Sequence, residues 1–239
     1  MSYQSRRAAR AAKTDERMEH AYPRRRKDAP KQNTTATYRG KPCLLQICAT
    51  EEQAFKQAQV MEAIARTGYA PQVYGTEGNR LWYESVSGES FDEKFRFAIL
   101  QDDTETLYAL ASKLSIFLQM FHSITSHTLG DPQFGDFVLR NDRCVCMRFD
   151  SLRQGLPYAD VASVIACALT RNAGDYYAAF PFVERVLECF HLSLMDIINE
   201  VSEKLDAYLD PETADKNIIL DTLMRARDGA YPDWIQYHK

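Results

Sequence analysis

The chain has 239 residues, of which 45% are apolar and 26% charged, and its formal net charge is −4. This length and balance are typical of one bilobal globular domain or two small ones with a sizeable buried core. The longest small-or-apolar run, about 161–169, is far shorter than the roughly 18 residues of a membrane span. No apolar signal segment follows the N-terminus, so a cytoplasmic protein without a membrane span is expected.

The charge is unevenly distributed. Residues 1–34 hold ten Lys and Arg against four Asp and Glu, a net charge of +6, which leaves −10 for the rest of the chain. The densest basic cluster is Arg24-Arg25-Arg26-Lys27. We predict that residues 1–33 form a disordered basic tail. The functional alternative is contact with a polyanion through this cluster.

The next region is typical of a small β-rich unit with one long helix. Thr50 and Gln53 have the spacing of a capping box, and Gln57 lies on the same helical side as Ala54 and Met61. In chain order the patterns predict β-structure at 34–39, a strand at Pro42–Cys48, a helix from Glu51 to about Arg66, and a hairpin of Pro71–Tyr74 with Leu81–Glu84.

A short helix is predicted from Ser90, followed by a long helix capped by Asp102 or Asp103. Large apolar residues recur along the long helix at spacings of three and four: Leu107, Leu110, Leu114, Phe117, Phe121 and Ile124. This pattern favours a helix buried in a bundle, with a coiled coil as the alternative.

The central stretch contains a loop, Gly130–Leu139, that carries Asp131 and Asp136. A turn at 141–143, a second strand at Cys144–Asp150 and an apolar helix that opens with Asp160 follow. Strand alternation would place four side chains on one face, Cys144, Cys146, Arg148 and Asp150, and three on the other, Val145, Met147 and Phe149.

Three helices are predicted after this stretch, at about Asp175–Phe190, Ser193–Tyr208 and Glu212–Arg227, with His191 at a helix end. The six cysteines form no CxxC pair, which favours buried, reduced thiols. The alternative for Cys144-x-Cys146 is a metal clip.

Helix, acid-containing loop, hairpin and acid-led helix, in this order and at these lengths, resemble the catalytic core of the kinase-like phosphotransferases. The pattern is most similar to that of the small bacterial kinases related to aminoglycoside and lipopolysaccharide kinases. The resemblance covers about Pro42 to Leu169. It implies an α+β, bilobal protein-kinase-like fold, with a small β-rich N-lobe at 35–85 that holds one long helix and a larger α-helical C-lobe at 90–228.

The resemblance also implies roles for individual residues. Asp131 stands where the family has its catalytic Asp, which orients the acceptor hydroxyl and takes its proton. Asp136 stands where the family has a magnesium-binding Asn, and Asp160 corresponds to an acid with a structural role beneath the catalytic loop. Seventeen residues after Asp131, where the family has a metal-binding Asp, this sequence has Arg148.

The family's Lys–Glu ion pair, which grips the nucleotide phosphates, corresponds to Gln46 and Gln57. Two glutamines can hydrogen-bond one another, but they lack the positive charge that holds a polyphosphate. Lys56 is adjacent to the second position and is an alternative cation.

Arg148 would point into the cleft at the place of a metal ligand. A guanidinium stays protonated and offers no lone pair to a metal. We therefore predict that it forms a charge-assisted bond with Asp131, Asp136 or Asp150. Asp136 and Asp150 are the alternative metal ligands if the site is rearranged.

Three hypotheses follow. The first is a pseudokinase that needs no cofactor and acts by binding an unknown protein partner. The second is an active kinase of small molecules or proteins that uses ATP and magnesium through a rearranged metal site. The third is an unrelated α-rich interaction module whose resemblance is accidental.

Overall fold

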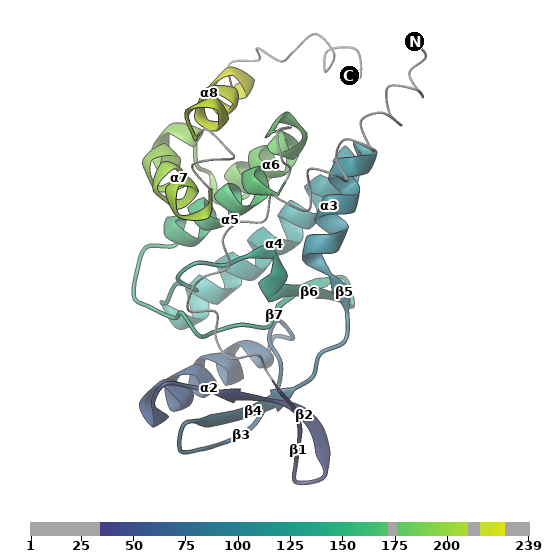
Figure 1. Ribbon diagram of the computed structural model, residues 1–239, viewed down its shortest axis with the longest axis vertical. Coiled ribbons are helices and arrows are strands. Elements are labelled where there is room, and N and C mark those ends of the chain that lie inside the picture. The colour runs from purple at the N-terminus through teal and green to yellow at the C-terminus, as the bar shows by residue number, and fades with distance from the viewer. Residues whose placement is uncertain (1–33, 172–175, 210–215, 228–239) are drawn as a thin grey trace. The chain divides into compact units, whose positions relative to one another are not determined.

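The computed structural model describes residues 34–171, 176–209 and 216–227 (Figure 1). Within them the chain is a mixed α+β protein, as predicted, with seven α-helices and two small antiparallel sheets. The predicted basic tail at 1–33 lies outside the described residues. The elements, in chain order, are β1 (Thr34–Tyr38), β2 (Lys41–Ile47), α2 (Glu51–Ala65), β3 (Val73–Glu77), β4 (Arg80–Glu84), β5 (Glu89–Ser90), α3 (Phe91–Gln101), α4 (Thr104–Thr125), the 3-10 turn η1 (Phe134–Asp136), β6 (Phe137–Arg140), β7 (Arg143–Cys146), α5 (Tyr158–Thr170), the 3-10 turn η2 (Tyr176–Ala179), α6 (Phe180–Phe190), α7 (Leu194–Tyr208) and α8 (Lys216–Arg227).

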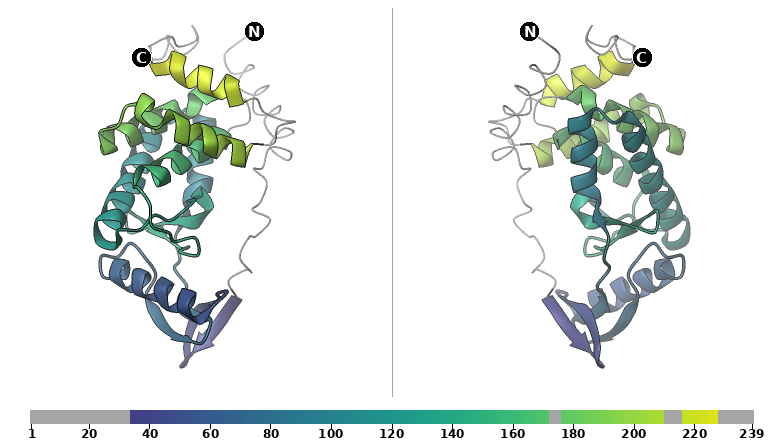
Figure 2. Two further views of the ribbon diagram at one scale, coloured as in Figure 1. Left: turned by 90° about the vertical axis from the view of Figure 1, so that its left-hand side faces the viewer. Right: turned by 90° about the vertical axis from the view of Figure 1, so that its right-hand side faces the viewer.

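The first sheet has four antiparallel strands in the order β1-β2-β4-β3. Helix α2 lies along one of its faces (Figures 1 and 2). The predicted capping residues begin this helix, because Thr50 Oγ1 accepts a hydrogen bond from Gln53 N at 3.1 Å. The predicted inner side of the helix is buried at Ala54, Gln57 and Met61.

The second sheet consists of β5, β6 and β7, and β6 and β7 form the predicted hairpin. Its two turn residues, Asn141 and Asp142, have φ of 49° and 64°, the backbone that a tight two-residue hairpin requires. The predicted strand to Asp150 is wrong at its end, because β7 stops at Cys146. The last residue of β7, Cys146, pairs with Phe137, which is the first residue of β6, so the pairing of the two strands ends there.

Helix α4 is the predicted long helix. Asp103 caps it, because its carboxylate accepts hydrogen bonds from Thr106 N at 3.0 Å and from Thr106 Oγ1 at 2.7 Å. Five residues of the predicted apolar face are buried: Leu107, Leu110, Leu114, Phe117 and Phe121. The prediction of a buried side chain is wrong at Ile124, which is 43% exposed near the end of the helix. The burial favours the bundle interpretation over the coiled coil.

The described chain falls into two compact units. The first, here called the site unit, comprises residues 34–94 and 112–161 and contains both sheets and α2. The second, the helical unit, comprises residues 95–111 and the described residues from 162 onward. The site unit takes residues from both predicted lobes, and the division into lobes at 35–85 and 90–228 stays a prediction.

Within the helical unit, the rings of Phe95 and Phe182 meet edge to face at 5.2 Å. Helix α6 begins at Phe180 rather than near Asp175, because the short turn η2 precedes it. His191 ends it with φ of 54°, which confirms the predicted helix end. The first residues of the helix predicted from Glu212 lie outside the described ranges, which resume at 216.

All six cysteines are free, and five of them are buried, as predicted: Cys43, Cys48, Cys144, Cys146 and Cys167. In the described ranges, no group of three or more His, Cys, Asp or Glu side chains is placed to hold a metal ion. Among the helices that the structure describes, none combines the length and apolar character needed to cross a membrane.

Candidate functional site

The loop that carries Asp131 rests on the first turn of α5. Asp160 there has no exposed surface, and its carboxylate accepts hydrogen bonds from Leu129 N at 2.8 Å and Gly130 N at 3.2 Å. His122 Nε2, at the end of α4, lies 2.9 Å from the same carboxylate. Asp160 therefore joins the end of α4, the start of the loop and α5 at one buried point. This arrangement agrees with the structural role that the resemblance implies for Asp160.

The other side of the loop is held by the segment that follows the hairpin. Thr128 and Arg153 pair through their backbones, with Thr128 N donating to Arg153 O at 2.8 Å. The Arg153 guanidinium also donates to the Gly130 carbonyl oxygen. Gly130 has φ of 92°, and a side chain there would collide with the Ser151 carbonyl. The backbone before Asp131 is thus held on both sides.

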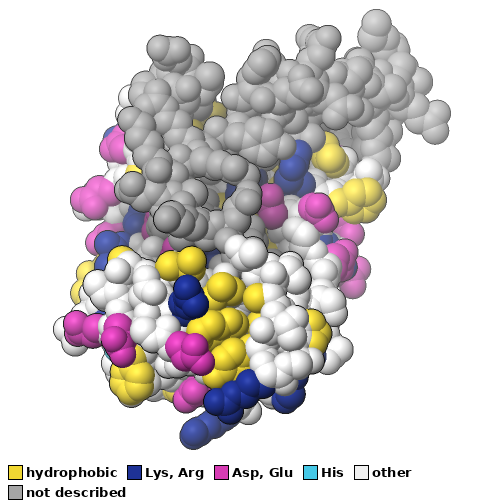
Figure 3. Space-filling model, turned by 60° about the horizontal axis from the view of Figure 1, so that its bottom comes forward, with side chains coloured by type: hydrophobic (Ala, Val, Ile, Leu, Met, Phe, Trp, Pro, Cys, Tyr) yellow, Lys and Arg dark blue, Asp and Glu magenta, His cyan; other side chains and the backbone are white. Residues whose placement is uncertain are grey.

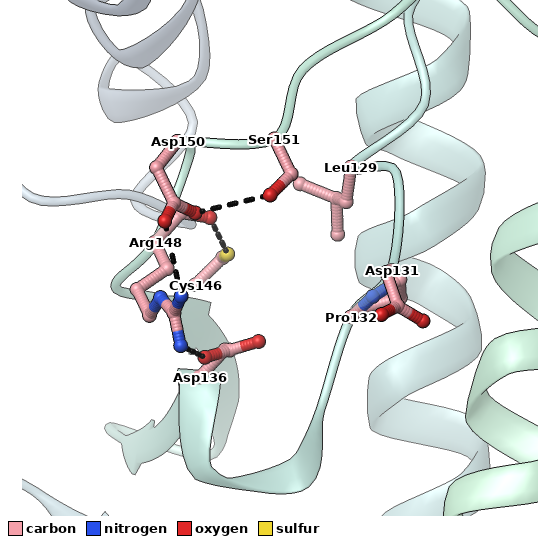
Figure 4. Close-up of a pocket in the computed structure, with 8 residues that line it drawn as sticks. All are labelled: Leu129, Asp131, Pro132, Asp136, Cys146, Arg148, Asp150 and Ser151. Atoms are coloured by element: carbon pink, nitrogen blue, oxygen red, sulfur yellow. Dashed lines mark hydrogen bonds and ion pairs between the residues drawn. The ribbon is translucent and has the colours of Figure 1, made fainter. Parts of the chain in front are cut away.

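The residues predicted to converge do line one pocket. Its lining consists of Leu129, Asp131, Pro132, Asp136, Cys146, Arg148, Asp150 and Ser151 (Figure 4). The free volume inside is about 10 Å³, which is the space of about one water molecule.

Arg148 forms the charge-assisted bonds predicted for it. Its Nη1 lies 3.0 Å from Asp136 Oδ1 and its Nη2 lies 3.0 Å from Asp150 Oδ2. Figure 4 shows the guanidinium between these two carboxylates, with Asp131 beside Pro132 on the other side of the pocket. Of the three predicted partners, Asp136 and Asp150 are therefore bonded to Arg148, and Asp131 lines the same pocket.

The charges of this cluster reinforce one another. Partial burial by itself lowers the pKa of Arg148, but the neighbouring Asp136 and Asp150 outweigh burial and raise this pKa above its ordinary value. Asp136 is only 7% exposed, and its second oxygen accepts a hydrogen bond from Gln133 N at 2.8 Å. Both oxygens of Asp136 are thus already bonded within the protein.

Gln46 and Gln57 meet as the sequence suggested. Gln46 Nε2 donates to Gln57 Oε1 at 2.9 Å, and both side chains are buried. The Cys48 thiol donates to the same oxygen at 3.5 Å. Lys56 is exposed to solvent, because the next residue along α2 is the one that faces the sheet. Lys56, the alternative cation at this position, therefore lies outside the buried pair.

No protein-family model matches the chain, and no curated protein matches it. The roles of the site residues therefore depend on their own geometry and on the resemblance of the sequence pattern. That geometry places two carboxylates around a cation at the pocket, and an uncharged amide pair between β2 and α2.

Several residues that join the sheet to the hairpin were not found from the sequence. Gln53, recognised only as a capping residue, also donates from Nε2 to the Asp150 carbonyl at 3.2 Å. Arg140 lies 2.7 Å from Glu84. Arg143 Nη1 donates to the Thr67 carbonyl at 2.7 Å. The contacts cross 56 to 97 residues of sequence, and local periodicity carries no signal at such separations.

Tyr83 was also missed. It is fully buried on β4, and its register partner is Leu44, two residues before Gln46 on β2. Burial first, and then the charge of Asp150, raise the pKa of Tyr83 above its ordinary range. Because side chains alternate along a strand, Tyr83 lies on the same face as Gln46 and Leu81. An apolar strand containing one Tyr gave no reason to assign it to the site.

Proposed function

We propose that this chain is a kinase-like protein that has lost magnesium-dependent phosphoryl transfer and acts by binding a protein partner. The observation that carries the proposal is the position of Arg148 between Asp136 and Asp150, at 3.0 Å from each. These are the two carboxylates that would hold a magnesium ion. A divalent cation in their place would face a permanent positive charge, and at about 4 Å this repulsion amounts to several kcal/mol even at an effective dielectric of about 20.

The amide pair supports the same proposal. Gln46 and Gln57 are bonded to each other at the positions that correspond to the phosphate-gripping ion pair of the family. Neither carries a charge. A polyphosphate would therefore lose its main electrostatic contact on this side of the site.

Support for a partner comes from exposed apolar side chains in the site unit. Ile47, which is 49% exposed, and half-buried Leu45 lie on the face of the sheet opposite α2, since Gln46 between them points to the helix. Figure 3 shows hydrophobic side chains gathered on this part of the molecule, bordered by charged ones. On α2, Phe55 is 57% exposed. Exposed apolar groups of this kind are common at protein interfaces.

The proposal includes a polyanion contact through the basic cluster at 24–27.

The test is calorimetry and thermal unfolding of the wild type with ATP and magnesium. We expect no magnesium-dependent ATP binding in the micromolar range. The variant Arg148→Asp should partly restore magnesium affinity, because it returns a carboxylate to the site. The matched control is Arg80→Asp, which makes the same charge change at the exposed start of β4 and should gain nothing.

The second candidate is an active kinase with a rearranged metal site. It is favoured by one observation, that Asp131, Asp136 and Asp150 all line the same pocket. If Arg148 moved aside, these carboxylates would be available to a metal. Micromolar magnesium-dependent ATP binding by the wild type would favour this candidate and contradict the proposal above.

A further inference from the structure

Strand β1 forms one edge of the first sheet, and within the described residues β2 is the strand that pairs with it (Figure 1). Its five residues, Thr34–Tyr38, carry no charge and include no proline, and three of them are threonine, which favours strands. Thr35 and Thr37 are exposed, and Ala36 between them is half-buried. Natural proteins usually protect such an edge, because its outward N–H and C=O groups can bind another strand.

The opposite edge of the same sheet, β3, is protected in these ways. Its register with β4 shifts between Val73 and Gly75, and such an irregularity bends an edge strand. The strand ends in a charged residue, Glu77, and α2 packs against β3 and β4. By contrast, the register of β1 with β2 is continuous from Thr34 to Tyr38. The edge of β1 is therefore the better template for an added strand.

The turn between β1 and β2 determines the hydrogen-bond pattern of the two strands. Residues 39–40 form a two-residue turn, both with positive φ, and Tyr38 lies opposite Lys41. The next pair is Thr37 with Pro42. Proline has no N–H, so this pair cannot exchange the two hydrogen bonds of a hydrogen-bonded pair. Thr37 and Pro42 are therefore a non-hydrogen-bonded pair.

This assignment shows which backbone groups of β1 point away from β2. Hydrogen-bonded and non-hydrogen-bonded pairs alternate along an antiparallel ladder. Ala36 and Tyr38 therefore direct their N–H and C=O groups to β2. Thr35 and Thr37 direct theirs to the outer edge of the sheet.

The outward groups of β1 are symmetric about Ala36. If a second copy of the strand lies antiparallel beside the first, with Ala36 opposite Ala36, then Thr35 of each copy lies opposite Thr37 of the other. Each of these two pairs can exchange two backbone hydrogen bonds, and the small alanines suit the close pair at the centre. Because residues 34–38 carry no charge, the pairing places no like charges opposite one another. The strand is thus complementary to itself across a two-fold axis.

The residues that precede β1 have a composition unsuited to the same edge. Residues 1–33 contain no Val, Ile, Leu or Phe and one Thr, whereas ten of them are Lys or Arg. Such a composition disfavours a strand. A second copy of the chain instead supplies a strand of the same length with a matching pattern of donors and acceptors.

We propose that two copies of this chain associate by antiparallel pairing of their β1 strands, with Ala36 opposite Ala36, so that the two four-stranded sheets join into one. A pairing of five residues is small compared with a permanent interface, so the association is weak and reversible. The inference concerns the first sheet, and it holds whether or not the chain binds another protein or ATP.

The first test is sedimentation velocity of the full chain from about 5 to about 500 µM, a range suited to a weak interface. We expect a monomer at the low end and a growing fraction of dimer at the high end. Thr35→Lys with Thr37→Lys places ammonium groups of the two copies opposite one another and should abolish the dimer. Thr35→Lys with Thr37→Glu places each new Lys opposite a Glu of the other copy and should restore it. A wild type that stays monomeric throughout, or a double-lysine variant that still dimerises, would overturn the proposal.

Two controls separate the pairing from net charge and from folding. Gln59→Lys with Glu62→Gln makes the same change in net charge on the exposed side of α2 and should leave the dimer intact. The double-lysine variant and its counterpart, Thr35→Glu with Thr37→Glu, should each be monomeric alone and form a heterodimer when mixed. Each variant should keep its melting temperature within about 4 °C of the wild type, because both threonines are exposed. A mixture that stays monomeric would contradict this register.

Amide hydrogen exchange of the wild type, followed residue by residue by NMR, locates the pairing without any substitution. The N–H groups of Thr35 and Thr37 should exchange about tenfold more slowly when about nine-tenths of the chains are paired than in dilute solution. Ala36 and Tyr38, already bonded to β2, should exchange at the same rate at both concentrations. Exchange at Thr35 and Thr37 that does not depend on concentration would overturn the proposal. If both were already protected in dilute solution, another segment of the chain would occupy the edge, and the proposal would fail as well.

Discussion

The loop from Leu129 to Asp136 is held at its base and at its mouth by opposite kinds of chemistry. At the base, the buried carboxylate of Asp160 accepts bonds from two backbone N–H groups and contacts His122. At the mouth, a cation takes the central place, since Arg148 binds the carboxylates of Asp136 and Asp150. One end is an acceptor surrounded by donors, and the other is a donor surrounded by acceptors.

The shape of the loop and the chemistry at its mouth depend on different residues. The backbone at Leu129 and Gly130 is fixed by Asp160, and this needs no charge at the mouth. Metal binding would depend on what stands between Asp136 and Asp150. Substitution of one residue at the mouth can therefore change the chemistry while the framework of the loop persists.

Removal of the acceptor at the base should have the largest effect. Asp160→Ala leaves the Leu129 and Gly130 N–H groups and the His122 ring without their acceptor, in a site with no exposed surface at Asp160. We expect a loss of about 3–5 kcal/mol in the free energy of unfolding, measured by urea denaturation. Asp160→Asn keeps one acceptor oxygen and should lose less. A loss below about 1 kcal/mol for Asp160→Ala would mean that the base does not hold the loop.

The uncharged amide pair of Gln46 and Gln57 allows a charge to be introduced at a third buried position. Gln46→Lys would place an unpaired ammonium in a site that is 7% exposed and should cost about 2–4 kcal/mol in urea unfolding. Addition of Gln57→Glu should recover at least half of this loss, because the new charges pair. The neighbouring substitution Ile47→Lys lies on the opposite, half-exposed face and should cost far less. Equal losses at the two positions would contradict the burial of the pair.

Removal of the cation at the mouth should have a smaller effect than removal of the acceptor at the base. Arg148→Ala leaves Asp136 and Asp150 without their partner, but the arginine side chain is 30% exposed, so water can reach the carboxylates. We expect a loss of about 1–3 kcal/mol in the absence of ligands. Arg185→Ala, which breaks the exposed pair with Glu188, should cost at most about 1 kcal/mol. An Arg148→Ala variant more stable than the wild type would show that Arg148 does not stabilise the mouth.

Much of this arrangement could be predicted from local sequence. Helical spacing and caps placed α2 and α4, and the turn at Asn141 and Asp142 placed the β6–β7 hairpin. The pairings of Gln46 with Gln57 and of Arg148 with carboxylates were expected from the resemblance to the kinase-like phosphotransferases, combined with the chemistry of the side chains. The mixed α+β class is confirmed, and the bilobal kinase-like arrangement stays a prediction.

The remainder depended on contacts between distant segments. Strand alternation was extended to Asp150, but β7 ends at Cys146 because β6 offers no further partner. Arg148 and Asp150 nevertheless meet, because Arg148 reaches both acids from an irregular segment. The contacts of Gln53 and Arg140 across the site unit could not be read from periodicity, which describes one element at a time.

A pH titration tests how dry the interior beside the mouth is, and its expected effect is the smallest. Burial, followed by the charge of Asp150, raises the pKa of Cys48 from 9.0 to about 11. The folded state therefore favours the neutral thiol. Its contribution to stability is complete below about pH 9 and is lost as the pH rises from about 9 to about 11, because the unfolded thiol ionises first.

The free energy of unfolding should accordingly fall between about pH 8 and pH 11, and it should fall by about 1–2 kcal/mol less in Cys48→Ala. Between about pH 6 and pH 8 the difference between the two proteins should stay constant, because the thiol is neutral in both states. Urea unfolding at each pH measures both slopes. Parallel curves up to pH 11 would mean that water reaches Cys48 in the folded protein, and the amide pair beside it would then belong to an open, hydrated mouth.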